Sequence, residues 1–228
     1  LIMNEATERG LTTNRIHKSA RFAVIRERSD SIYLNEAEIQ ELEELDLTNN
    51  KKLERVRDLF LVGYYTGQRF SDYSTIDAGK ITVDEDGDEF LEITQIKTGH
   101  AIQIPVHPNL KLIIEKHGGK LPRTYSNQKT NEYLKIIGKI VPCLQENVTV
   151  DLPTKGGMKV NITCPKYELI TTHTARRSFA TNHYLAGWPQ RTIMNLTGHK
   201  TERAFTSYIR LTSKEHAKVG HALWKKKS

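Results

Sequence analysis

The spacing of apolar residues changes twice along the chain, and this change constrains the fold more than any other feature. From residue 35 to residue 67, apolar residues recur at the three- and four-residue spacing of amphipathic helices, whereas from Lys80 to Val106 they alternate with polar residues. Helical spacing then returns. Because a period of 3.6 indicates helices and a period of two indicates strands, the sequence predicts a helical protein interrupted by a small sheet.

Two helices are predicted before the sheet. In "LNEAEIQELEEL", Asn35 can cap the helix and Glu38 follows three residues later, which is the spacing of a capping box. The second helix, "NNKKLERVRDLFLVGYYTG", is followed by Gly67, a residue type typical of helix C-termini. Arg69 therefore lies just past a helix end, in the turn sequence "TGQRFSDYS".

The alternating region predicts a three-stranded antiparallel meander. Its strands are "KITV", "EFLEITQIK" and "AIQIPV", separated by the turn "DEDGD" and by a turn around Thr98 and Gly99. Lys97 then lies at the tip of the second strand. The ambiguous segment 147–165 is interpreted as a small hairpin inserted between helices.

Helical pieces make up the rest of the chain and set the fold class. We predict an α+β fold, mostly α-helical with a small three-stranded antiparallel sheet. One compact domain, residues 31–228, follows an N-terminal arm, residues 1–30. The helices expected after the sheet are "HPNLKLIIEKHGG", "SNQKTNEYLKIIGKIV", "TARRSFATNHYLAG", "PQRTIMNLTG", "ERAFTSYIR" and "TSKEHAKVGHALW".

Composition narrows the class of protein. Lys and Arg outnumber Asp and Glu by 34 to 27, a balance that is compatible with a polyanionic partner without requiring one. No apolar run is long enough for a membrane span, and no signal peptide is visible. Cys143 and Cys164 form no CxxC motif and are expected to be free thiols. Met3 is not the first residue, so the chain is expected to be a fragment.

A histidine and an arginine open one of the predicted helices. In "HTARRSF", His173 and Arg176 are three residues apart and share a helix face, close to backbone N–H groups that favour an anion. Taken alone, the pair favours a capping histidine and an arginine that pairs with a carboxylate.

Two further stretches carry polar residues in turns. "TGHKTERAFTSYIR" places His199 after a helix and Tyr208 nine residues later on the next helix. "TGQRFSD" places Asp72 three residues after Arg69. Taken alone, these are compatible with a loop histidine, a half-buried tyrosine and a surface salt bridge.

In their order and spacing, these residues resemble the catalytic set of the tyrosine recombinase (phage integrase) family. The set is Arg69, Lys97, His173, Arg176, His199 and Tyr208, and the resemblance covers about residues 33–225. "HTARRSFAT" and "TGHKTERAFTSYI" look most like integrases of mobile elements from Bacteroidetes. Many relatives have Leu where this chain has Thr197, a position we interpret as structural. The family's N-terminal core-binding domain is missing, so residues 1–30 look like its tail and a linker.

The resemblance implies a reaction and a role for each residue. Tyr208 attacks a DNA phosphodiester to give a 3′-phosphotyrosine and a free 5′-hydroxyl. Arg69 and Arg176 stabilise the charge that develops on the phosphate, and His199 donates to it. His173 accepts or relays the tyrosine proton, and Lys97 protonates the leaving oxygen. The remaining expected roles are a supporting contact from Asp72 and possible DNA contacts from Arg177 and Lys200.

The resemblance also implies partners and cofactors. The partner is double-stranded DNA at attachment or target sites, bound by a homotetramer on synapsed DNA, while this fragment alone is expected to be a monomer. No cofactor is implied, since the sequence contains no P-loop and no H-E-x-x-H motif. The expected location is the bacterial cytoplasm, in association with the nucleoid, and no membrane is involved.

Three other interpretations remain open. A type IB topoisomerase shares the cleavage chemistry but relaxes DNA without exchanging strands between duplexes. A non-catalytic DNA-binding regulator on the same scaffold is expected to lack Arg69, Arg176 or Tyr208, all of which are present here. A generic helical binding domain is the third.

Overall fold

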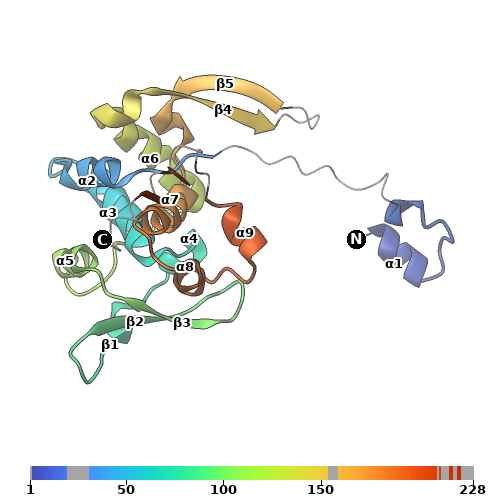
Figure 1. The fold of residues 1–228 in the computed structure, drawn as a ribbon, viewed down its shortest axis with the longest axis horizontal. Helices are drawn as coiled ribbons and strands as arrows, with labels where there is room; N and C mark the ends of the chain where they lie inside the picture. The colour runs from blue at the N-terminus through green and yellow to red at the C-terminus, as the bar shows by residue number, and fades with distance from the viewer. Residues whose placement is uncertain are drawn as a thin grey trace. The chain divides into compact units, whose positions relative to one another are not determined.

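The computed structural model describes residues 2–19, 31–153 and 159–209, together with residues 211, 216–217 and 220–221. The α-helices are α1 (Ile2–Glu8), α2 (Glu36–Glu44), α3 (Lys51–Thr66), α4 (Phe70–Tyr73), α5 (Pro108–Lys116), α6 (Asn127–Ile140), α7 (Thr172–Leu185), α8 (Gln190–Thr197) and α9 (Glu202–Thr206) (Figure 1). The 3-10 turns are η1 (Ile16–Lys18), η3 (Ala78–Lys80), η4 (Pro142–Gln145) and η5 (Lys166–Leu169). The strands are β1 (Ile81–Val83), β2 (Glu89–Thr94), β3 (Ala101–Pro105), β4 (Asn147–Pro153) and β5 (Lys159–Pro165).

The chain divides into two compact units. The larger contains residues 31–148 and 164–228, and the smaller contains residues 1–30 and 149–163. Strands β4 and β5 pair with each other, as the hairpin interpretation of this segment predicts. All of the candidate site residues belong to the larger unit.

Helix α3 is the centre of the larger unit. It contacts α2, α5, α6 and α7 (Figure 1). Its side chains are therefore buried on almost every face. Phe60 and Val62 are fully buried although they lie on different sides of the helix. In the neighbouring α2, Asn35 and Glu38 form the predicted capping box. This packing gives the end of α3 a fixed position from which the following turn begins.

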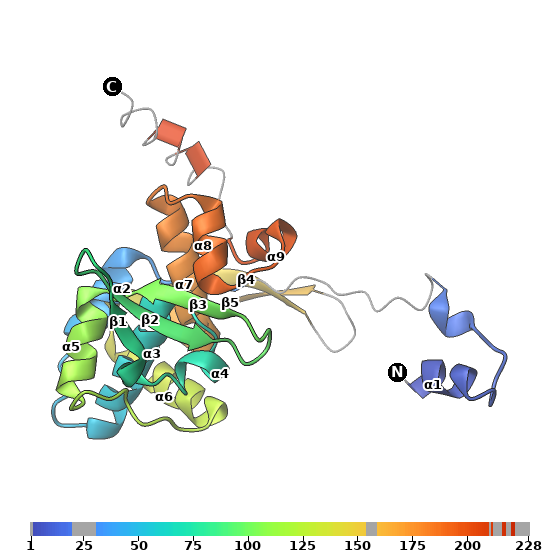
Figure 2. The ribbon, with the colours of Figure 1, turned by 90° about the horizontal axis from the view of Figure 1, so that it is seen from below.

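The predicted meander is confirmed. Strands β1, β2 and β3 are antiparallel neighbours in chain order, with Leu91 of β2 opposite both Ile81 and Ile104. Leu91 and Ile104 are buried, and helix α8 packs against β3 (Figure 2). Lys97 was expected at the tip of the second strand, but β2 ends at Thr94 and Lys97 lies in the turn that joins β2 to β3.

Two helix boundaries differ from those expected from sequence. Helix α7 begins at Thr172, so Arg176 lies more than one turn inside it. The N–H groups of Thr171 and Thr172 are taken by Thr174 Oγ1 at 3.0 Å and Asn131 Oδ1 at 2.8 Å, so side chains satisfy the start of the helix.

Helix α9 ends before Tyr208, which we expected on the helix itself. The N–H of Tyr208 donates to the carbonyl of Phe205 at 2.8 Å. This hydrogen bond spans three residues and closes a turn after α9 ends at Thr206. Most of the predicted last helix, 212–224, lies outside the described residues. Within the described segments, no helix is long and apolar enough to cross a membrane.

Gly67 supplies a test of how tightly α3 and α7 are fitted together. It ends α3 in the left-handed conformation, with φ of 65°, and a Cβ built on it would lie 2.5 Å from the Phe179 ring. We expect Gly67→Ala to lower the free energy of unfolding by about 2–4 kcal/mol, from backbone strain and overpacking together. Denaturant unfolding measures this change.

Gly118 is the matched control for that substitution. It has a similar φ of 69° but nothing within 4 Å of a built Cβ. Gly118→Ala should therefore cost only the strain of the left-handed conformation, about 1 kcal/mol. Equal losses for the two variants would contradict the close fit between Gly67 and Phe179.

Candidate active site

The guanidinium group of Arg176 is buried at the junction of α3 and α7. Arg176 is fully inaccessible, and its Nη1 donates to the carbonyl of Gly67 at 2.9 Å. Its Nε is also buried and has no hydrogen-bond partner among the described residues. Burial lowers the pKa of Arg176 to about 10, with the nearby charge of Arg69 acting in the same direction. The side chain is therefore a buried cation at neutral pH.

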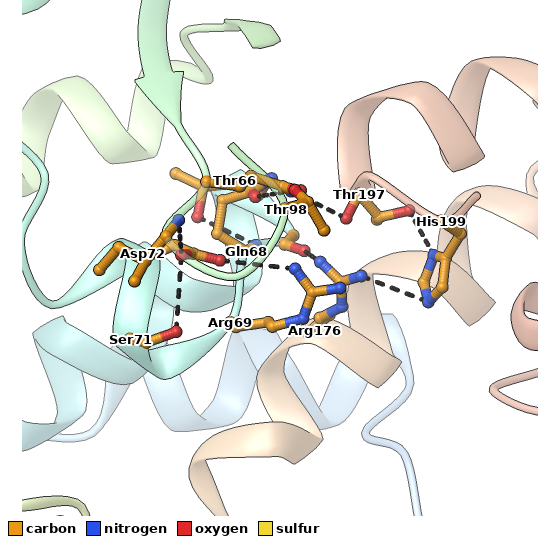
Figure 3. A network of polar contacts seen from close by, with 12 residues as sticks. Thr66, Gln68, Arg69, Ser71, Asp72, Thr98, Arg176, Thr197 and His199 are labelled. Atoms are coloured by element: carbon orange, nitrogen blue, oxygen red, sulfur yellow. Dashed lines mark hydrogen bonds and ion pairs between the residues drawn. The ribbon is translucent and has the colours of Figure 1, made fainter. Parts of the chain in front are cut away.

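Arg69 lies beside Arg176 and is only partly compensated by a carboxylate (Figure 3). It is the N-cap residue of α4, and its Nη1 is 3.7 Å from Oδ2 of Asp72. The other oxygen of Asp72 accepts from the backbone N–H of Ile96 at 2.9 Å. Asp72 thus connects Arg69 with the end of β2. Two guanidinium groups with one partly shared carboxylate make a local excess of positive charge that favours an anion.

His199 completes one side of this cluster. Its Nε2 is 3.3 Å from Nη2 of Arg176, and its Nδ1 is 2.7 Å from the hydroxyl of Thr197. Gly198, in the left-handed conformation with φ of 69°, turns the chain between them. Burial lowers the pKa of His199 to about 3, assisted by Arg176 and Arg69. The imidazole is therefore neutral at pH 7.

Tyr208 and His173 lie next to each other on another side of the cluster. The Tyr208 hydroxyl is hydrogen-bonded to Nε2 of His173. The Tyr208 ring also lies 4.7 Å from the His199 ring and 5.6 Å from the Arg176 guanidinium carbon. Burial lowers the pKa of His173 to about 4, with Arg177 and Arg176 adding to the effect. A neutral imidazole is the form that can accept a proton from the phenol.

The remaining candidates lie at the margin of the cluster. Lys97 is exposed, and among the described residues it has no hydrogen bond or ion pair. Lys200 is exposed too, and with His100 and His199 it lines a hollow of about 520 Å³. Arg177 donates to the carbonyl of Ile32 at 3.1 Å, and its guanidinium carbon is 5.7 Å from the centre of the Tyr208 ring. The structure thus brings together five of the six predicted residues, and Lys97 is the exception.

A buried amide at the end of β2 was missed by the sequence analysis. Gln95 Nε2 donates to Gln68 Oε1 at 2.7 Å and to the carbonyl of Thr197 at 3.1 Å, while its Oε1 accepts from the Thr98 hydroxyl at 2.8 Å. Gln95 follows Leu91 and Ile93 on the inward face of the strand. A glutamine at a position where the alternation predicts an apolar, inward-facing residue was the signal that could have revealed the buried amide.

Gln68 extends this amide network to the helix that precedes His199. Its Nε2 donates to the carbonyl of Leu196 at 2.7 Å and to that of Thr66 at 2.9 Å. Both glutamine side chains are fully buried. The turns connected in this way are those that carry Arg69, Lys97 and His199.

The described residues offer no obvious metal centre. No group of three or more His, Cys, Asp or Glu side chains is arranged among them to hold an ion. The two guanidinium groups of the cluster instead suit an oxyanion such as a phosphate.

Comparison with known proteins gives the family. Residues 33–215 match the model of the phage integrase family, and the chain belongs to that family. Transposase B from transposon Tn554 of Staphylococcus aureus (strain Mu50 / ATCC 700699) is 24% identical over 172 residues, which are 75% of this chain and 27% of the transposase. The chain thus spans about a quarter of the length of this curated relative.

Solved structures with the same fold come from site-specific recombinases and integrases. A lambda integrase(75–356) dimer bound to a COC′ core site has a TM-score of 0.61 at 20% identity, covering 91% of this chain and 69% of that one. XerH recombinase in a post-cleavage complex with difH substrate has a TM-score of 0.57 at 12% identity, covering 87% and 54%. The Tn1549 transposon integrase in complex with circular intermediate DNA has a TM-score of 0.57 at 13% identity, covering 96% and 74%. The expected fold class is confirmed.

Gln95 provides a test of the amide network. Gln95→Ala would leave the Oε1 of Gln68 and the carbonyl of Thr197 without a donor, and buried polar groups without partners are costly. We expect the free energy of unfolding to fall by about 2–4 kcal/mol. We also expect faster amide hydrogen exchange in the turn at residues 95–99, where the N–H groups of Thr98 and Gly99 bond to the Gln95 carbonyl.

Gln103 is the matched control on the adjacent strand. It is exposed, and its amide bonds only to the exposed Glu92. Gln103→Ala should change stability by no more than about 0.5 kcal/mol. If Gln95→Ala is equally mild, the network does not hold the three turns together.

Proposed function

We propose that the chain is the catalytic domain of a site-specific DNA recombinase or integrase, which cuts and rejoins DNA through a 3′-phosphotyrosine intermediate. The observation that carries this proposal is the convergence of a tyrosine hydroxyl, a neutral histidine and two arginines. Tyr208 is hydrogen-bonded to His173 at one edge of the cluster that holds Arg176 and Arg69. A nucleophile, a proton acceptor and a cationic site for a phosphate are thus side by side.

In the proposed reaction Tyr208 attacks the phosphorus of a DNA phosphodiester. A phenol is a weak nucleophile while it keeps its proton, so the proton must leave during the attack, and Nε2 of His173 accepts it. A bond forms between Tyr208 Oη and phosphorus, and the bond from phosphorus to the 5′-oxygen breaks. Lys97 gives a proton to that oxygen, which becomes a hydroxyl. The phosphotyrosine conserves the bond energy, and the reverse reaction rejoins the strand.

The arginines and His199 act on the charge of the transition state. Negative charge grows on the non-bridging oxygens of the phosphate, and each guanidinium can donate paired hydrogen bonds to it. Because Arg176 is held by Gly67 and Arg69 by its position beside Asp72, little reorganisation is needed when the charge develops. Preorganised donors of this kind are usually the largest electrostatic contribution to catalysis. Asp72 supports Arg69, while Arg177 and Lys200 are candidate DNA contacts.

The setting of this activity is part of the proposal. The substrate is double-stranded DNA at attachment or target sites, and four protomers act on two synapsed duplexes, whereas this chain alone is a monomer. Residues 1–30 are the tail of a core-binding domain and a linker. The parent protein integrates or excises a mobile element, of the kind found in Bacteroidetes, at the nucleoid in the bacterial cytoplasm. The family membership and the "HTARRSFAT" and "TGHKTERAFTSYI" motifs support this setting.

The nucleophile is tested with a nicked duplex that carries the joined ends of the mobile element. The nick lets the cut fragment diffuse away, so the covalent complex accumulates. We expect a protein–DNA band with the parent chain and none with Tyr208→Phe, which lacks only the hydroxyl. Binding of the duplex should change by less than about threefold, because phosphate contacts dominate affinity.

Tyr184 gives the matched control for this experiment. It lies on α7, with its ring 6.5 Å from that of Phe205, outside the cluster. Tyr184→Phe should form the covalent band at the parental rate. A band that survives in Tyr208→Phe would rule out Tyr208 as the nucleophile.

The role of Lys97 is tested by changing the leaving group. We expect Lys97→Ala to cleave normal DNA about 10²–10⁴-fold more slowly, the usual contribution of a general acid. A duplex with sulfur in place of the bridging 5′-oxygen has a leaving group that needs no proton, so the variant should cleave it at close to the parental rate. Rates of single-turnover cleavage give both values. Lack of rescue by sulfur would mean that Lys97 does not supply this proton.

A further inference from the structure

Thr197 makes two short hydrogen bonds with its single hydroxyl group. The side chain is fully buried, and its Oγ1 lies 2.6 Å from the carbonyl oxygen of Ile193 and 2.7 Å from Nδ1 of His199. A carbonyl oxygen can only accept, so the hydroxyl proton points to Ile193. The other contact then requires that Nδ1 of His199 carries a proton and donates it to Thr197.

This arrangement determines the form of the His199 ring. A neutral imidazole has one N–H, so a proton on Nδ1 leaves Nε2 with a lone pair. Nε2 faces Nη2 of Arg176 at 3.3 Å, and a guanidinium can only donate (Figure 3). The hydrogen bonds therefore run in one direction, from Arg176 through His199 and Thr197 to the carbonyl of Ile193.

A phosphate at this site would disturb the chain of bonds. Phosphate oxygens accept hydrogen bonds, and the lone pair on Nε2 of His199 has nothing to donate. The ring can gain a second proton on Nε2. Alternatively, the ring can move its proton from Nδ1 to Nε2. The lone pairs of Nδ1 and Thr197 Oγ1 would then face each other, unless the Thr197 hydroxyl turned its proton away from the carbonyl of Ile193.

We propose that Thr197 holds the proton of His199 on Nδ1, so that binding of a DNA phosphate takes up one proton from solvent onto Nε2. Thr197 is in this sense a positioning residue, and the inference rests on the proposed function. The proton that arrives makes His199 a cation, and its new N–H donates to the phosphate. No bond of the DNA is changed in this step.

The surroundings of His199 favour this coupling. The groups that face it or line its hollow are Arg176 and His173 of α7, Arg69 before α4, Tyr208 after α9, His100 beside β3 and the neighbouring Lys200. None of these side chains is a carboxylate. Burial and the two arginines keep the pKa of His199 near 3 in the free protein. A bound phosphate reverses the sign of the local field, and the pKa must rise.

The pH dependence of binding follows from the direction of that change. The imidazolium forms more readily in the complex than in the free protein. The added affinity is therefore present below the pKa of the complex and is lost as the pH rises through it. Between the two pKa values, the dissociation constant should increase about tenfold per pH unit.

The first experiment reads the proton position in the free chain. Long-range ¹H–¹⁵N spectra of histidine-labelled protein at pH 7 distinguish the two neutral forms of the ring. We expect His199 in the Nδ1–H form in the parent and in Thr197→Ser, which keeps the hydroxyl. Thr197→Val is nearly isosteric but has no hydroxyl, so it removes one of the two contacts that favour Nδ1–H and should shift the ring toward the Nε2–H form. A parent spectrum with the proton on Nε2 would overturn the inference.

The second experiment counts protons. Calorimetric titration of Tyr208→Phe with the nicked duplex, in buffers with different ionisation enthalpies at pH 7, should show uptake of about one proton. We expect the uptake to persist with Thr197→Ser, to fall with Thr197→Val, and to disappear with His199→Gln added. Binding without uptake in the Tyr208→Phe background, or uptake that survives His199→Gln, contradicts the inference. Failure to bind the duplex at all would instead count against the proposed function.

Discussion

The contact between the Arg176 guanidinium and the carbonyl of Gly67 connects the core of the molecule to its candidate active site. Burying a guanidinium without a carboxylate directly beside it costs several kcal/mol unless other groups compensate. Here the compensation comes from a carbonyl, from the lone pair of His199 and from dense packing of α7 on α3. The left-handed turn at Gly67 makes the contact geometrically possible, because any side chain there would collide with Phe179.

The same arrangement leaves the site with charge that the protein does not neutralise. Asp72 lies 3.7 Å from Arg69 and is shared with the backbone of Ile96, so the two arginines remain an incompletely balanced pair. Burial of the two imidazole rings, together with the positive charge of the arginines, depresses the pKa values of His173 and His199 and keeps both rings neutral. Holding such a pair in place lowers the folding stability and gives the site affinity for an anion. The Gln68–Gln95 network is fully inaccessible to solvent, and it holds the turns that carry Arg69, Lys97 and His199 in fixed positions relative to one another.

Local features of the sequence explain why much of this could be predicted. The capping box at Asn35, the glycine after α3 and the alternation in β2 depend only on neighbouring residues, and all three are present. The ordered set of polar residues pointed to the family without any knowledge of the fold. Helix ends were predicted less well. Side chains from elsewhere, such as Asn131 at the start of α7, decide them.

Contacts between residues far apart in sequence were beyond the reach of pattern analysis. Gln95 bonds to Gln68 across 27 positions and to Thr197 across 102, and no periodicity encodes such pairs. Thr197 was interpreted as a structural substitution for Leu, but its hydroxyl contacts His199 directly. The hydrogen bond between Tyr208 and His173 likewise depends on how the turn after α9 returns to α7.

The identity of the residue that becomes linked to DNA tests the account most directly. After trapping on the nicked duplex, nuclease and trypsin digestion should leave a nucleotide remnant on one peptide, which mass spectrometry can sequence. Trypsin separates the two tyrosines of interest, because Tyr208 falls in "AFTSYIR" and Tyr184 in "SFATNHYLAGWPQR". We predict the remnant on Tyr208 in "AFTSYIR". A remnant on any other residue, or DNA cleavage that leaves no covalent remnant, would contradict the account.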